Sequence, residues 1–471
     1  MEIQLATQSY KSDSLPISAQ RCINAYAEMQ PPGASTRVAV FGSPGLTQFT
    51  NVGSGPIRGG IAVNGVAYVV SGSSFYSVNA DGTSTLLGGG IIGNANISMD
   101  GNSFEIIIVN GTLGWSYLIA TASFVQISDP NFMPANTVCS IHDAFAFDIA
   151  GTNQFQISNL LDGRTYSTLN RATAESHPSL VLAVANHRGQ LLVYTTTDIE
   201  IWQNTGAANF AYAPINGALV DKGILAPLAS CFEDEGQFYL GNDFVFYRLA
   251  GLQKQRISTF ALEAEWRSFL IFNDAICFVY TFRGHKFVTL TFPTANRTFV
   301  WDIASSLWHE RESYDPRGLT VRWRGNCAID CYGKILIGDS QSGQVGFLDK
   351  NRYTEFGNPI ITQLVLPAIY RGGLMFGMPR FELDMETGVG AVSGQGQFPQ
   401  VMLDWSDDGG FTFGAPQLWN SIGTIGTTMT RLQWNGLGSS YERYLRLSIS
   451  DPVKRVFRGA RCPSLFFDEA P

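Results

Sequence analysis

The side chains that could carry out chemistry are few and widely spaced. The chain has five histidines: His142, His177, His187, His285 and His309. None of them belongs to a zinc-protease motif of the form His-Glu-x-x-His. Cys327 and Cys331 lie four residues apart, but no second pair completes a zinc site. We therefore predict no catalytic residue, no metal site and no bound cofactor.

The seven cysteines are odd in number and mostly lie inside apolar runs such as Asp274–Tyr280. This pattern is typical of buried, reduced thiols and not of a disulfide framework.

A glycan-cleaving enzyme is the alternative that the acidic and arginine residues raise, because glycosidases use paired carboxylates. Acidic residues gather in the turn Glu233–Glu235 and at Glu310 and Glu312, and we interpret both groups as solvent-exposed rims. Four arginines are available to hold a substrate carboxylate: Arg58, Arg164, Arg171 and Arg188. Their positions in the sequence do not indicate whether the four side chains meet at one site. A glycan-binding or glycan-hydrolysing propeller, similar to a sialidase, remains the second interpretation.

One polar loop brings three candidate residues close together in the sequence. Arg171, Glu175 and His177 lie between the turn at Asp162-Gly163 and an apolar run that begins at Ser179. The loop has no second acid, metal partner or oxyanion-binding device, so we predict a contact between blades or between subunits and not an active site.

A hairpin turn near the C-terminus has the S-x-D-x-G-x-T spacing of an Asp-box, carried by Ser406, Asp408, Gly410 and Thr412. In such turns the Asp carboxylate accepts hydrogen bonds from backbone N–H groups, so its role is structural. Calcium bound by Asp404, Asp407 and Asp408 is the alternative.

Charge is distributed unevenly along the chain. The whole chain carries −8, whereas residues 431–461 hold seven basic and two acidic residues, a net charge of +5. Six of these basic residues are interface candidates: Arg431, Arg443, Arg446, Lys454, Arg455 and Arg458. These residues would either lie on solvent-exposed faces of strands or contact another subunit or a phosphate backbone. The net negative charge of the whole chain argues against a protein whose entire surface binds nucleic acid.

The elements that must position these residues are predominantly strands. The chain has 49 glycines and 15% charged residues, and its short apolar runs alternate with turn signals such as Asn64-Gly65. Three runs, Ser179–Val184, Gln190–Thr195 and Asp198–Gln203, form one unit of an antiparallel sheet. Similar units occupy 59–90, 97–124, 139–168, 226–256, 274–308 and 325–352. We predict an all-β fold with a β-propeller-like array of six or seven antiparallel blades.

Three domains follow from changes in this pattern. Residues 1–58 are rich in Pro and Gly and predict an extended N-terminal arm that needs a partner surface or the next domain. Residues 59–356 form the propeller-like domain, with one helix at Thr259–Ile271. Residues 357–471 form a C-terminal β-sandwich with strands at 378–385, 400–405, 430–434 and 443–449. The first fourteen residues have no signal-peptide pattern and no apolar run reaches eighteen residues, so we expect synthesis in a cytoplasm without export or membrane insertion.

Several segments resemble the packaged-DNA stabilisation proteins, also called tail hub or nozzle proteins, of short-tailed bacteriophages. Between residues 162 and 206 the matching segments are Asp162, Tyr166, Ala172–Pro178, Ile199–Trp202 and Thr205-Gly206, and downstream they are Lys222–Ile224 and Arg256–Thr259. Elsewhere they are Asn24–Tyr26, Ser43–Leu46, Trp405–Gly410 and Asp451–Lys454. The similarity spans most of the chain.

The resemblance implies a structural virion protein that is not an enzyme. Such proteins form a homohexameric ring below the portal and the head-to-tail adaptor ring. They continue the channel for double-stranded DNA and retain the packaged genome until ejection, with a plug or needle and tail fibres or spikes attached nearby. We expect DNA to pass through the lumen without sequence-specific binding, and we expect the protein to be made in the host bacterial cytoplasm.

Overall fold

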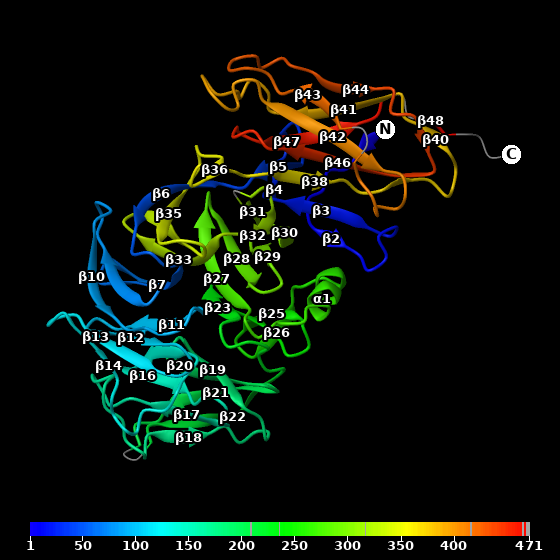
Figure 1. Cartoon of the computed structure of the whole chain (residues 1–471). Helices are drawn as coiled ribbons and strands as arrows, with labels where there is room; N and C mark the ends of the chain where they lie inside the picture. Colours follow the sequence, from blue (N-terminus) through cyan, green and yellow to red (C-terminus); the bar gives the residue numbers. More distant parts are fainter. Residues whose placement is uncertain (208–209, 235, 316, 415–416, 464–465, 468–471) are drawn as a thin grey trace.

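The computed structural model describes residues 1–207, 210–234, 236–315, 317–414, 417–463 and 466–467. Strands account for nearly all of its regular structure (Figure 1). The helix α1 (Phe260–Arg267) is the exception. None of the helical segments within these ranges has the length and apolarity needed to span a membrane. The predicted all-β fold is confirmed.

Seven four-stranded antiparallel blades follow one another around an axis and form a β-propeller (Figure 1). Five of them are separate sheets, and blades six and seven are parts of larger sheets. Blades one to three are β7 (Ile57–Val63) to β10 (Ser84–Gly89), β11 (Ser98–Gly101) to β14 (Ser123–Gln126), and β15 (Val138–Ile141) to β18 (Arg171–Thr173). Blades four to six are β19 (Val181–His187) to β22 (Tyr212–Asp221), β23 (Ser230–Glu233) to β26 (Gln253–Arg256), and β27 (Ile276–Phe282) to β30 (Leu307–Glu310). The first strands of all seven blades line a pocket on the axis.

The two middle strands of blades one to six are β8 (Val66–Ser71), β9 (Ser74–Val78), β12 (Glu105–Val109), β13 (Gly114–Leu118), β16 (Ala144–Asp148), β17 (Gln154–Ile157), β20 (Gln190–Thr195), β21 (Asp198–Asn204), β24 (Gly236–Leu240), β25 (Phe246–Ala250), β28 (His285–Phe292) and β29 (Arg297–Asp302). Most of their residues are buried because each blade packs against two neighbours. Tight turns join them. Asn64 and Gly65, with φ of 51° and 74°, connect β7 to β8 in the left-handed conformation that a two-residue hairpin requires.

The N-terminal segment completes the seventh blade. The strands β33 (Gly325–Cys331), β34 (Lys334–Asp339) and β35 (Gln344–Asp349) supply three strands of this sheet. The fourth is β6 (Gly45–Asn51), which pairs antiparallel with β35, with Leu46 opposite Leu348. Two short strands, β36 (Thr354–Glu355) and β37 (Asn358–Pro359), extend the sheet beyond β6. A strand from the start of the chain therefore closes the ring of blades.

Two sheets form the C-terminal sandwich. One has the order β4 (Ala25–Met29), β5 (Val38–Gly42), β47 (Val456–Arg461), β41 (Arg380–Met385) and β44 (Leu432–Asn435), with β1 (Glu2–Ile3) also paired to β47. The other has the order β3 (Ala19–Ile23), β38 (Thr362–Val365), β46 (Glu442–Ile449), β42 (Gln400–Ser406) and β43 (Leu418–Ser421). β2 (Tyr10–Lys11) and β39 (Ile369–Tyr370) pair with β3 and β46. The core between the sheets includes Phe381, Leu403, Leu445 and Phe457.

Short pairs complete the set of strands. β31 (Glu312–Tyr314) pairs with β32 (Thr320–Arg322), and β40 (Phe376–Gly377) pairs with β45 (Ser439–Ser440) and β48 (Phe466–Phe467).

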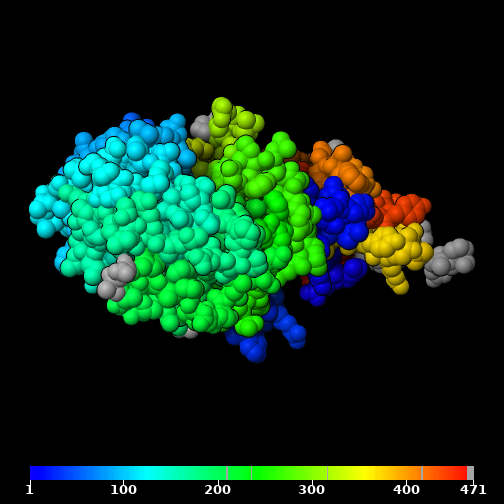
Figure 2. Space-filling view, turned by 90° about the horizontal axis from the view of Figure 1, so that it is seen from below, coloured from blue at the N-terminus to red at the C-terminus, as the bar shows by residue number. Residues whose placement is uncertain are grey.

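The propeller and the sandwich share one continuous sheet. β3 lies between β30 of blade six and β38 of the sandwich, because Ile23 pairs with both Glu310 and Gln363. The Asn24 side chain donates hydrogen bonds to the carbonyl oxygens of Glu312 and Ile361, at 2.8 and 2.9 Å. Figure 2 shows the blue N-terminal residues between the green propeller blade and the orange and red sandwich. The strands of residues 1–58 are thus distributed between the two domains and paired within the chain.

The single helix forms where the sequence predicts one, and it is shorter than the prediction. Thr259 caps its first turn by accepting a hydrogen bond from the Leu262 N–H, and Ser268 ends it. Leu262 and Trp266 are buried against blades five and six, whereas Leu270 is exposed. The predicted extension to Ile271 is wrong because the residues after Ser268 leave the helical path.

Leu46 tests the ring closure by β6. Replacing Leu46, which is 2% exposed, with Ala should lower the free energy of unfolding by about 2–5 kcal/mol, since a cavity opens next to the closing strand. Gln48→Ala, at an exposed position of the same strand, should change it by less than about 0.5 kcal/mol. Chemical denaturation measures both values, and equal effects would contradict a closing role for β6.

Candidate interface surfaces and buried charge networks

The polar loop that contains Glu175 and His177 connects blade three to blade four. Its backbone is held by β21, because the Ser176 N–H donates to Glu200 Oε1 at 2.8 Å. His177 Nδ1 lies 2.5 Å from Asp198 Oδ2. The other Glu200 oxygen accepts the Trp202 indole N–H at 2.9 Å. The loop is therefore an ordered contact between blades.

The three candidates of this loop do not converge on one site. Glu175 is exposed, and the His177 side chain is 55% exposed despite its bond to Asp198. Arg171 is half-buried in β18, where it donates to the Asn131 carbonyl oxygen at 2.7 Å. Glu175 and His177 are thus available on the surface, and Arg171 acts within blade three.

Acidic residues from neighbouring strands neutralise most of the basic C-terminal segment. Arg446 binds both oxygens of Asp404, at 2.8 and 2.5 Å. Arg443 binds both oxygens of Asp407, at 2.6 and 2.7 Å, and donates to the Leu437 carbonyl oxygen. These bidentate pairs fix the face of β46 against β42 and its turn.

Arg455 is wholly internal. Its guanidinium donates to Thr362 Oγ1 and to the carbonyl oxygens of Ile360 and Asp451, and it is 1% exposed. Burial lowers the pKa of Arg455 to about 10, so it remains protonated at neutral pH.

The remaining basic candidates lie on the surface. Lys454 pairs with Glu386, and Arg458 pairs with Asp384. Arg431, 66% exposed, lies 4.0 Å from Glu382. We call Arg431, Lys454 and Arg458 the basic rim. Because exposed ion pairs contribute at most about 1 kcal/mol, these side chains can exchange their partners for another subunit at little cost.

The Asp-box residues form a closed turn. Asp408 Oδ1 accepts hydrogen bonds from the N–H groups of Phe411 and Thr412, at 3.1 and 3.0 Å. Ser406 Oγ accepts from the Gly410 N–H at 2.9 Å. The three carboxylates of the calcium alternative are directed to different partners, since Asp404 and Asp407 bind arginines and Asp408 binds the turn.

The interpretation of Glu310 and Glu312 as an exposed rim is wrong. Glu310 is 2% exposed and binds Arg21 at 2.5 Å and Arg297 at 2.6 Å. Glu312 is partly buried and contacts the same two arginines. Burial alone would raise the pKa of Glu310, but the charges of Arg21 and Arg297 hold it well below its usual range. The carboxylate is thus committed to the junction between the two domains and is not a free catalytic acid.

The other acidic cluster lies where the sequence places it, in the turn after β23. Glu233 and Asp234 both approach Lys286, at 2.6 and 3.6 Å. Glu235 lies outside the described residues.

The arginines considered for a substrate carboxylate are separated from one another. Arg58 is 2% exposed and donates to four backbone carbonyl groups, including those of Gly72 and Ala95. Arg164 donates to Ser116 and to the Ser123 carbonyl oxygen. Arg58 and Arg164 brace turns in the first three blades, and Arg171 lies in β18 of blade three. Arg188 lies in the turn between β19 and β20 of blade four, so the four arginines belong to different parts of the propeller.

The seven cysteines are not joined in disulfides. Cys231 and Cys277 bring their sulfur atoms within 3.0 Å of each other across blades five and six.

Sequence patterns did not reveal the buried charges of the seventh blade. Arg311 is 0% exposed, binds Glu355 at 3.2 Å and stacks over the Trp323 ring at 4.1 Å. Arg324 binds Asp339 at 2.5 Å. Arg311 lies between β30 and β31, and Arg324 lies between β32 and β33, each in a segment that contains other charged residues. No local pattern therefore indicated that either side chain is buried.

Two protein-family models match consecutive parts of this chain. A model described as the β-propeller of bacteriophage P22 Gp10 matches residues 1–353, and a model described as the β-sandwich of bacteriophage P22 Gp10 matches residues 361–463. No curated protein matches the chain.

Solved structures resemble this chain at low sequence identity. A streptogramin B lyase is 10% identical with a TM-score of 0.43, over 64% of this chain and 97% of that one. The β-propeller domain of Cps50 (Swd1) from Myceliophteria thermophila is 11% identical with a TM-score of 0.43, over 64% and 98%. The computationally designed Ika8 protein is 10% identical with a TM-score of 0.37, over 64% and 99%. With TM-scores below 0.5, none of them bears on function.

His309 provides a test of the buried junction. Burial, and secondarily the charge of Arg311, lowers the pKa of His309 to about 3, so it is neutral in the folded protein. Since the unfolded chain protonates this residue below its ordinary value of about 6.5, folding loses stability as pH falls from 6.5 towards 3. Between pH 6.5 and 5 the loss is about 2 kcal/mol at about 1.4 kcal/mol per pH unit.

His309→Phe should remove this contribution. Denaturant unfolding at pH 7 and pH 5 should show a smaller drop in the variant than in the wild type. His285, whose pKa is raised because it donates a hydrogen bond to Asp302, is present in both proteins, so the difference isolates His309. An identical drop in the two proteins would show that His309 is protonated in the fold.

Proposed function

This chain belongs to the bacteriophage P22 Gp10 family of phage structural proteins, and on that premise we propose that it forms the tail hub, or nozzle, of a short-tailed phage. Six copies would form a ring below the portal and its adaptor ring, continue the DNA channel and retain the packaged genome until ejection. The observation that carries the proposal is the match of both family models, in order, to the propeller and the sandwich of one chain. The protein would be made in the host cytoplasm and would have no enzymatic activity.

The fold suits a rigid wall. Ring closure by β6 leaves no blade without a partner, and β3 joins the propeller to the sandwich through backbone hydrogen bonds. A wall that retains DNA has to resist pressure without hinging between its parts. The shared sheet and the Arg21–Glu310–Arg297 network oppose such a hinge.

The pocket on the propeller axis is too small to hold a DNA duplex. It has a volume of about 350 Å³. The major groove of a duplex, about 12 Å wide and about 8.5 Å deep along a helical turn of about 34 Å, alone spans roughly 3,000 Å³. A channel for DNA therefore requires several copies arranged around a common axis. The net charge of −8 favours weak contact between such a lumen and the phosphate backbone.

The surface residues that we assign to subunit or adaptor contacts are Glu175 and His177 on one side and the basic rim on the other. The first pair lies between blades three and four, and the basic rim lies on the sandwich. Because these surfaces are far apart in the fold and differ in charge, they suit head-to-tail contacts, which close into rings. Tail fibres or spikes and a plug or needle would occupy other faces.

Assembly is the direct test of this function. The purified chain, alone and mixed with the adaptor ring of the same phage, should form six-fold rings that negative-stain electron microscopy and mass photometry detect. The adaptor provides the template, because copies bound side by side on a ring reach a high local concentration. A chain that stays monomeric with the adaptor present would contradict the proposal.

The basic rim should contribute to that assembly. A triple variant, Arg431→Glu with Lys454→Glu and Arg458→Glu, should reduce ring formation at least about tenfold at low salt, because charge complementarity steers association. Its monomer should keep the wild-type melting temperature within a few degrees, since exposed pairs contribute little stability. A control with Arg317→Glu and Lys350→Glu, exposed on the propeller side, should assemble normally. Equal loss in both variants would show that net charge matters and the position of the rim does not.

A further inference from the structure

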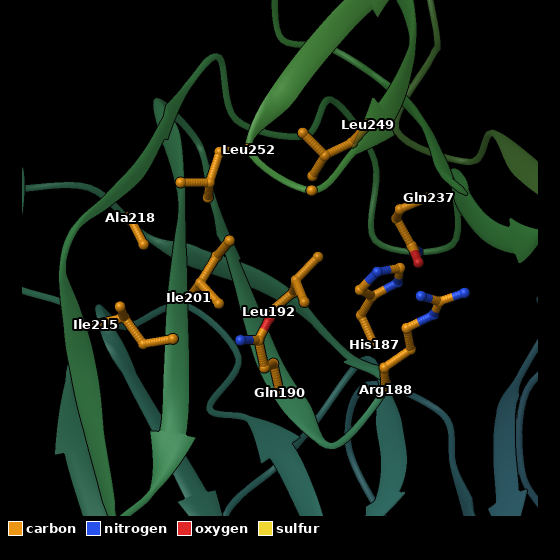
Figure 3. Close-up of a pocket in the computed structure, with 11 residues that line it drawn as sticks. His187, Arg188, Gln190, Leu192, Ile201, Ile215, Ala218, Gln237, Leu249 and Leu252 are labelled. Carbon is orange, nitrogen blue, oxygen red and sulfur yellow. The ribbon is translucent and has the colours of Figure 1, made fainter. Parts of the chain in front are cut away.

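A cavity of about 430 Å³ lies between blades four and five (Figure 3). Strands β20, β21 and β22 form one side of it, and β24 and β25 form the other. It continues the apolar core between these two blades, which is otherwise filled by side chains such as Tyr194 and Tyr239. The cavity is the part of that core which the chain leaves unfilled.

An irregular outer strand creates this space. In the pairing of β21 with β22, Glu200 lies opposite Leu219 and Trp202 lies opposite Pro214. Residues 215–218 thus face the single residue Ile201, so β22 bulges away from the blade. Gly217, with a φ of 78°, provides the left-handed conformation that the bulge needs.

The walls of the cavity are apolar and fixed by strands. Leu192, Ile201 and Leu249 are each at most 4% exposed, and they form its base. Ile215 and Ala218 come from the bulge, and Leu252, which is 45% exposed, lies at the rim. Because these residues sit on paired strands and a tight turn, the cavity is largely preformed, as ligand sites usually are.

One end of the cavity carries polar groups that lack partners. Gln237 is 2% exposed, and its Oε1 has no hydrogen-bond partner among the described residues. The same holds for Nδ1 of His187. Figure 3 shows the Gln237 oxygen and the His187 ring together at this end, away from Ile215. A buried acceptor without a partner costs about 1–3 kcal/mol, which a ligand that donates a hydrogen bond would recover.

The charge state of this end favours an uncharged ligand. Burial, and then the neighbouring charge of Arg188, lowers the pKa of His187, so the ring is neutral at neutral pH. No carboxylate is among the residues that line the cavity. Arg188 also lines the polar end, but its side chain is exposed, so solvent screens its charge. A charged ligand group in the apolar part would lose its hydration without gaining an opposite charge.

We propose that this cavity binds an uncharged, mainly apolar molecule of about two fused rings that donates one hydrogen bond to Gln237 Oε1. The volume lies within the range of about 300–1,000 Å³ that small-molecule sites occupy. The inference does not depend on the tail-hub function, because it rests on one gap between two blades.

Two probes that differ in one hydrogen-bond donor test the proposal. 2-Naphthol has a hydroxyl that donates, and 2-methoxynaphthalene has the same ring system without a donor. Titration calorimetry on the full chain should show binding of 2-naphthol at least about tenfold tighter than that of 2-methoxynaphthalene. Bound 2-naphthol should also raise the melting temperature, because it binds the folded state alone.

Variants locate the site and its acceptor. Gln237→Leu should reduce the preference for 2-naphthol to within about twofold, whereas Gln255→Leu, at an exposed position of β26, should leave it unchanged. Ala218→Trp should fill the cavity and abolish the binding of both probes. Leu252→Asp, at the exposed rim, should weaken both at least about tenfold and provides the same test if the filled variant does not fold.

Three outcomes would overturn the inference. They are absence of binding by either probe, binding that persists in folded Ala218→Trp or Leu252→Asp, and a preference for 2-naphthol that survives Gln237→Leu.

Discussion

Backbone pairing by the first fifty residues is the constraint on which the rest of the structure depends. β6 supplies the last strand of the seventh blade, and β3 bridges blade six and the sandwich. Because strands from both ends of the propeller sequence pair with each other, the ring has no free sheet edge where it closes. A free edge would expose unpaired backbone donors and acceptors, which favour aggregation. The same segment therefore determines the integrity of the ring and the position of the second domain.

Buried charge strengthens this arrangement at the places where strands from distant parts of the chain meet. Arg21 of β3 reaches Glu310 of blade six, and Arg311 reaches Glu355 beside β6. Breaking such a pair leaves an uncompensated charge in the interior, which costs several kcal/mol, so each pair penalises any displacement of the N-terminal strands. These buried ion pairs fix the positions of the strands that they join. The residues of the basic rim, in contrast, carry their charges on the surface.

A rigid, acidic, two-domain wall fits the proposed place in a phage tail. The closed propeller offers no passage for DNA along its own axis, so the proposed function would belong to a ring of copies, with its site between chains. The exposed loop at Glu175 and the basic rim provide two surfaces of different character, as a head-to-tail ring requires. The cavity between blades four and five is a separate feature, because it results from one bulge in β22 and involves neither surface.

The sequence by itself determined the all-β class, the repetition of small antiparallel units, four strands of the sandwich and the existence of the helix, and it left the number of blades at six or seven. These features follow from local periodicity and from turn residues such as Asn64-Gly65, which act over a few residues. Only the tertiary structure decided that β6 closes the ring, that Glu310 is buried, that Arg443 and Arg455 are bound internally, and that Gln237 faces a cavity. In each case the deciding contact joins residues far apart in the chain, and no local pattern specifies which distant charge or strand edge a residue will meet.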